Sequence, residues 1–214
     1  MPLPSEIAPY LDEVVRRVRR SLGDDLLGVW LIGGTAQGAY QHGVSDVDVL
    51  AVSNDPGEVA KRQSLGDSLV HPTLPCPAVG LEFVWYALPD LVELDDPVKF
   101  QLNVNGGPER DRAVQIGPDD SPNWWSVLDL AAARQAGVPL VGPRCDQVVP
   151  PVPADRVRQA ILGSLDWHDG PAPRSDRWIR HSLRRSATSS VNAWADPRGL
   201  PSRRAGRRHC RSRR

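Results

Sequence analysis

The sequence predicts an α+β fold with an α/β-type core, and two patterns in its 214 residues support this. Apolar runs at about 26–32, 47–53 and 80–88 have the length and composition of buried strands. Around them lie segments whose apolar residues recur at helical spacing, beginning with one from Ser5 to about Leu22. Strands that alternate with helices favour a sheet with helices packed against it.

The helices of this first part are predicted from periodicity and from residues that start and stop helices. In the first helix the apolar positions are Ile7, Leu11, Val14, Val15, Val18 and Leu22. We expect Ser5 to cap this helix and Gly23 to end it. A second helix is expected over residues 57–70, and the proline-rich segment 71–77 is expected to be a loop.

The pattern changes after Pro89. Residues 98–106 are expected to add a further strand, and residues 124–135 and 154–167 have the composition of helices. These helices suggest a small, incomplete helical domain after the sheet. The predicted organisation is a sheet-containing domain at 1–110, a partial C-terminal helical domain at 111–170 and an arginine-rich tail at 171–214.

The tail differs from the rest of the chain in charge. From residue 174 onward there are thirteen arginines and two aspartates, although the whole chain has 26 basic and 26 acidic residues. With so few apolar residues, we expect disorder there. Such a tail can contact nucleic acid non-specifically through phosphates; a dedicated nucleic-acid-binding arm is the alternative, and it predicts steeply salt-dependent binding. No other nucleic-acid contact is expected.

Several features limit the other partners. The sequence has no apolar run of about 18 residues, so no membrane span is expected. The first residues lack the basic and apolar segments of a secretory signal. Cys76, Cys145 and Cys210 are widely spaced and show no metal-ligand pattern, which favours a reducing cytoplasm. We expect a cytoplasmic monomer.

The segment with most chemical content runs from Gly33 to Asp48. The first predicted strand ends in Gly33, Gly34 and Thr35, and glycines allow the backbone to approach phosphate closely. Asp46 and Asp48 follow at a spacing that places both side chains on one face of a strand. Taken alone, this pair of aspartates is also compatible with a turn cap followed by a surface strand.

An acid in the next predicted strand favours a functional site over a turn cap. Glu82 occupies a position that a half-buried strand normally gives to an apolar residue. If Glu82 meets Asp46 and Asp48, three carboxylates repel one another unless a cation neutralises them. Magnesium prefers such oxygen ligands and commonly bridges carboxylates to substrate phosphates. The three acids therefore predict a magnesium site.

Together, Gly34-Thr35, Asp46-x-Asp48 and Glu82 resemble the nucleotidyltransferase superfamily pattern, which implies a mixed sheet with flanking helices. Four later stretches resemble aminoglycoside adenylyltransferases that act on streptomycin and spectinomycin. These stretches are residues 100–108, 137–143, 151–153 and 162–168. The resemblance covers roughly residues 5–170.

The resemblance implies an enzyme that transfers AMP from ATP to a hydroxyl of an aminoglycoside. Asp46, Asp48 and Glu82 would be catalytic and would bind two magnesium ions, with Glu82 also taking the proton of the acceptor hydroxyl. Gly34 and Thr35 would contact the triphosphate of ATP. Trp167 matches a tryptophan of the drug site. The expected partners are therefore ATP and a small aminoglycoside.

Some positions leave alternatives open. Asn103 and Asn105 face one way on the strand predicted over 98–106, which suits either substrate contact or cross-strand hydrogen bonding. The basic clamp that the family supplies from a later helix is absent, and Asp176, Arg184 or Arg185 are weak substitutes. Two other functions therefore remain: transfer to a different acceptor, and an inactive nucleotide-binding remnant.

Overall fold

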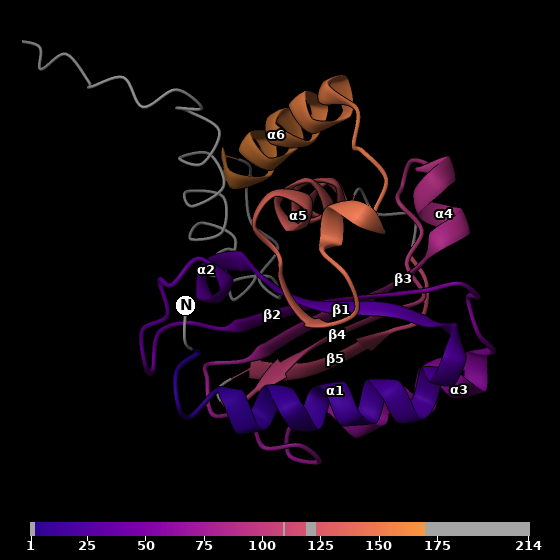
Figure 1. The fold of residues 1–214 in the computed structure, drawn as a ribbon. Helices are drawn as coiled ribbons and strands as arrows, with labels where there is room; N and C mark the ends of the chain where they lie inside the picture. The colour runs from indigo at the N-terminus through magenta and orange to yellow at the C-terminus, as the bar shows by residue number, and fades with distance from the viewer. Residues whose placement is uncertain (1–2, 109, 119–122, 170–214) are drawn as a thin grey trace, which may run out of the picture.

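The computed structural model describes residues 3–108, 110–118 and 123–169, with side chains through Asp166 in the last segment, and they form a mixed six-stranded sheet (Figure 1). In chain order the strands are β1 (Leu26–Ile32), β2 (Val47–Ser53), β3 (Leu81–Ala87), β4 (Leu102–Gly107), β5 (Arg110–Gln115) and β6 (Val138–Val141). The spatial order is β5-β4-β3-β2-β1-β6. Strands β2 and β3 pair in parallel, and the other neighbours pair antiparallel.

Helices cover both faces of this sheet (Figure 1). One face carries α1 (Ala8–Leu22) and α3 (Val59–Leu69), and the other carries α5 (Trp124–Ala136), on which α6 (Ala154–Asp169) packs. Two short helices, α2 (Gly33–Ala36) and α4 (Leu88–Glu93), follow β1 and β3 directly. Residues 23–25 and 145–147 form single 3-10 turns. The predicted α+β class with a mixed sheet and flanking helices is confirmed.

Side chains alternate between the two faces along each strand, and this alternation divides the core into two clusters. On β1, Val29 and Leu31 belong to the cluster under α1, whereas Trp30 and Ile32 belong to the cluster under α5. The same alternation on β2 and β3 turns every second residue toward α5. The acidic residues at positions 48 and 82 fall on that side.

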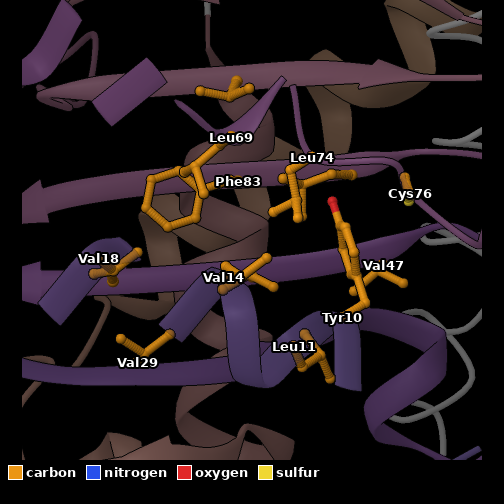
Figure 2. Close-up of a cluster of buried hydrophobic side chains, with 14 of the residues drawn as sticks. Tyr10, Leu11, Val14, Val18, Val29, Val47, Leu69, Leu74, Cys76 and Phe83 are labelled. Atoms are coloured by element: carbon orange, nitrogen blue, oxygen red, sulfur yellow. The ribbon is translucent and has the colours of Figure 1, made fainter. Parts of the chain in front are cut away.

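The cluster under α1 holds the first helix against the sheet. The apolar face of α1 meets residues of β1, β2, β3 and the loop after α3 (Figure 2). The labelled residues of this contact are Tyr10, Leu11, Val14, Val18, Val29, Val47, Leu69, Leu74, Cys76 and Phe83. All are buried, so this dry layer stabilises the strands that carry the acids through removal of apolar surface from water.

The predicted elements are found with small shifts at their ends. Strands over 26–32 and 47–53 match, and Gly23 ends α1 with a positive φ of 56°. The prediction that Ser5 caps α1 is wrong, because the helix begins at Ala8 and Ile7 occupies the cap position without a side-chain cap. The amides of Ile7 and Ala8 instead donate to the carbonyl of Pro4.

Two strands were not predicted. The strand expected over 98–106 begins only at Leu102, and after a tight connection the chain returns as β5. Strand β6 is four residues long and contains Pro139, so it lacks the length and composition that periodicity detects. The sheet thus takes two strands, β5 and β6, from residue 110 onward. The division into domains at 1–110 and 111–170 remains a prediction, and the tail at 171–214 lies outside the described residues.

Within the described part of the chain, no helix combines the length and the apolar character needed to cross a bilayer.

Candidate active site

Three carboxylates converge at one end of the parallel pair β2–β3. Asp48 lies on β2 directly opposite Glu82 on β3, and Asp46 immediately precedes β2. One carboxylate oxygen from each residue lies within 4.8 Å of the other two. Asp48 is only 8% exposed, while Asp46 and Glu82 are half-buried. The convergence expected from the sequence is present; the catalytic and metal-binding roles of the three acids remain predictions.

The glycine turn after β1 supports the most buried of these acids. Gly33 has a φ of +67°, and a Cβ atom at this position would lie 1.9 Å from Oδ2 of Asp48. The carboxylate therefore packs directly against the backbone of a residue that must be glycine. Gly34 is different, because a Cβ atom there would meet nothing within 4 Å.

Thr35 has a structural contact that the sequence did not indicate. Its hydroxyl is buried and donates a hydrogen bond to the backbone carbonyl of Asp46, with 2.9 Å between the oxygens. This bond ties the turn after β1 to the residue that leads into β2. The predicted contacts of Gly34 and Thr35 with a triphosphate remain untested.

Burial and like charges make this site unfavourable for a full set of ionised acids. Burial is the main reason that the pKa of Asp48 lies well above its usual range, and the charges of Asp46 and Glu82 raise it further. A divalent cation would relieve both costs. The donors are all hard carboxylate oxygens, which suit magnesium, so the residues present fit the predicted ion.

Arg110 is a site residue that the sequence analysis missed. Its guanidinium donates one hydrogen bond to Oδ2 of Asp46 at 2.9 Å and one to Oε1 of Glu82 at 3.0 Å. It is the first residue of β5, in a segment for which the sequence analysis predicted no strand. Since β5 itself was not predicted, no sequence signal placed this arginine near the acids.

Asp129 is a fourth acid near the site. It lies on α5, half-buried, and its burial raises its pKa to about 8, with a further contribution from the charge of Glu82. The sequence did carry a signal for this residue, because Asp129 interrupts an otherwise apolar stretch between Leu128 and Leu130. At neutral pH this carboxyl is therefore largely protonated in the folded protein.

Asp129 should make stability depend on pH in a defined direction. A folded-state pKa near 8, against about 4 in the unfolded chain, means that the folded state holds the extra proton between these values. Stability is then full below about pH 4 and falls as the pH rises toward 8. Replacing Asp129 with asparagine should remove this loss, so the variant should become increasingly more stable than the natural chain as the pH rises from 5 to 8.

Urea denaturation of both proteins at pH 5 and pH 8 measures this effect. The exposed acid Asp166 on α6 provides the control, since Asp166→Asn also removes a carboxyl from a helix. A gain for Asp129→Asn that is the same at both pH values would contradict the expected titration.

The two predicted substrate residues on β4 lie beside the acids. Asn105 is the direct cross-strand neighbour of Glu82, and its side-chain amide donates to Oδ1 of Asn103 at 2.9 Å. A hydrogen bond within the pair is thus present, and contact with a substrate remains a prediction. Trp167 falls within α6, but its side chain lies outside the described residues, as do Asp176, Arg184 and Arg185.

The order and direction of the six strands define the class of fold. The chain shares the nucleotidyltransferase fold of the spectinomycin adenyltransferase AAD(9) from Enterococcus faecalis, which was solved with ATP and spectinomycin. The two structures align with a TM-score of 0.58 at 17% identity, over 76% of this chain and 68% of the other. This likeness confirms the predicted fold.

Sequence similarity points to particular relatives. Aminoglycoside (3'')(9) adenylyltransferases of Shigella flexneri and Escherichia coli are each 27% identical over 172 residues, which is 78% of this chain. The corresponding protein of Klebsiella pneumoniae is 26% identical over the same length. The chain spans 65% of the length of these relatives. The predicted resemblance to aminoglycoside adenylyltransferases is confirmed, although no protein-family model matches the chain.

Proposed function

We propose that this protein transfers AMP from ATP to a hydroxyl of an aminoglycoside of the streptomycin or spectinomycin type. The observation that carries the proposal is the cluster of Asp46, Asp48 and Glu82 beside the turn at Gly33. The similarity to aminoglycoside (3'')(9) adenylyltransferases supports this acceptor class.

Each predicted site residue has a separate role in the proposed transfer of AMP. Asp46, Asp48 and Glu82 would hold two magnesium ions, which when bound neutralise phosphate charge during transfer. Asp48 is fixed by its packing on Gly33, and Asp46 by the hydrogen bond from Thr35 to its carbonyl. The backbone at Gly34 and Thr35 is where we place the triphosphate.

Glu82 is the proposed proton acceptor. The acceptor hydroxyl loses its proton to this carboxylate, its oxygen bonds to the α-phosphorus of ATP, and the bond to pyrophosphate breaks. Asn105 neighbours Glu82 and so is placed to orient the acceptor, together with Asn103. Trp167 is the proposed apolar contact for the drug.

The proposal is tested by incubating the full chain with ATP, magnesium and a panel of aminoglycosides that includes streptomycin and spectinomycin. Pyrophosphate release and the appearance of an adenylylated drug by mass spectrometry are the readouts. Glu82→Gln should reduce kcat by roughly 100-fold or more, because the amide cannot accept the proton.

Two alternative functions give different results in the same assay. Turnover with another hydroxyl compound but none with aminoglycosides would identify a different acceptor. Binding of ATP without turnover of any acceptor would indicate a nucleotide-binding remnant. We further propose a cytoplasmic monomer, since ATP is an intracellular substrate and the cysteine pattern favours a reducing compartment.

A further inference from the structure

Arg110 occupies the position where a cation would neutralise the acids. Its two terminal nitrogens lie 2.9 Å from Asp46 and 3.0 Å from Glu82, and its side chain is only 8% exposed. It therefore forms a fork between two of the three predicted metal ligands. This pairing offsets part of the repulsion among the carboxylates.

The chain leaves room for this arginine. A Cβ atom on Gly80 would lie 2.9 Å from Cδ of Arg110 and 3.1 Å from Nη1, so the side chain of Arg110 lies across the bare backbone at Gly80. The backbone of Arg110 is also held in the sheet, because Arg110 pairs with Gly107 of β4. The guanidinium is thus held in place by packing as well as by charge.

A magnesium ion and this guanidinium compete for the same carboxylates. Magnesium binds oxygen at about 2.0–2.1 Å with strict geometry, and a second positive group within a few ångströms repels it. Arg110 must therefore withdraw from Asp46 or Glu82 when the ion binds. A withdrawn guanidinium needs an anionic partner, and the triphosphate that accompanies the ion supplies one.

We propose that Arg110 exchanges partners: it neutralises Asp46 and Glu82 in the cation-free protein and binds the triphosphate once the metal has displaced it. The inference rests on the proposed function only in using the same triad as the metal site. In this proposal Arg110, the first residue of β5, is the basic group that binds the nucleotide. The consequence is that metal and nucleotide bind cooperatively.

Manganese is a suitable probe, because free Mn²⁺ can be followed by electron paramagnetic resonance. We expect Arg110→Gln to bind Mn²⁺ alone roughly tenfold more tightly than the natural chain, since the competing charge is gone. The same variant should bind Mn²⁺ with a non-hydrolysable ATP analogue roughly tenfold more weakly. A merely structural role would move both affinities in one direction.

Two other variants complete the experiment. Arg112→Gln is the matched control, because Arg112 lies two residues further along β5 and pairs with the exposed Asp67. It should leave both affinities unchanged. Arg110→Lys keeps one charge and should lie between Arg110→Gln and the natural chain, and it provides a second test if Arg110→Gln folds poorly.

The outcomes separate the two proposals. If all forms bind Mn²⁺ with the same affinity, with and without the nucleotide, the exchange of partners is wrong and the metal site remains. If the natural chain, Arg110→Gln and Arg110→Lys all fail to bind Mn²⁺ in either condition, both the metal site and the exchange are overturned.

Discussion

Replacing Asp48 with asparagine is expected to abolish adenylyl transfer and, at the same time, to stabilise the metal-free protein. Activity should fall by at least about a thousandfold, because the most buried predicted metal ligand loses its charge. Stability should rise by about 1–3 kcal/mol at neutral pH, because burial and the neighbouring acids already disfavour the ionised form.

The sign of the stability effect follows from the direction of the pKa shift. The pKa of Asp48 is raised in the folded state, so its contribution is favourable below the unfolded value of about 4 and is lost as the pH rises. The gain from Asp48→Asn should therefore increase with pH above 4. Addition of magnesium should reverse the order, since only the natural chain gains from binding the ion.

Thermal denaturation with and without magnesium measures both parts of this prediction. Asp24→Asn, a change at an exposed acid, is the control for a general effect of net charge. The buried carboxyl of Asp48 is expected to destabilise the metal-free folded state. This expectation is contradicted if Asp48→Asn is less stable than the natural chain without metal.

Replacing Gly33 with alanine should have the largest effect on stability among the substitutions considered. The backbone at Gly33 is left-handed, and the new Cβ would lie 1.9 Å from Oδ2 of Asp48. We expect a loss of about 2–4 kcal/mol from the strained φ angle and the displaced carboxylate together. Metal affinity should fall with it, because Asp48 can no longer keep its position.

Gly34 provides a matched control one residue away. A Cβ atom there meets no other atom within 4 Å, and Gly34 lies in the short helix α2. Gly34→Ala should therefore be neutral or slightly stabilising by urea denaturation. Equal losses for the two alanine variants would show that the close approach of Asp48 to Gly33 does not determine the result.

The part of the site that could be predicted from the sequence is the part built on regular strands. The two-residue spacing of Asp46 and Asp48 fixes a common direction, and Glu82 follows in a strand whose apolar residues are easily recognised. What could not be predicted depends on pairings between distant segments. Arg110 reaches the acids only because β5 folds back onto β4, and its sequence has no alternating apolar pattern.

Other differences have equally local causes. Asp129 was visible as an acid within an apolar helix, but only the packing of α5 on the sheet brings its charge near Glu82. The start of α1 was misplaced because Pro4, and not Ser5, satisfies the first amides. The hydrogen bond from the Thr35 hydroxyl to the carbonyl of Asp46 had no sequence signal, while the contact of Thr35 with a triphosphate stays a prediction.

The position of β6 has a consequence for how the protein is made. Strand β1 pairs on one side with β2, the next strand in the sequence, and on its other side with residues 138–141 of β6. During synthesis, β1 consequently presents unpaired amides and carbonyls until α5 and then β6 have emerged from the ribosome. Exposed strand edges of this kind pair with other chains, so we expect the growing polypeptide to be most prone to aggregate before residues 138–141 have emerged.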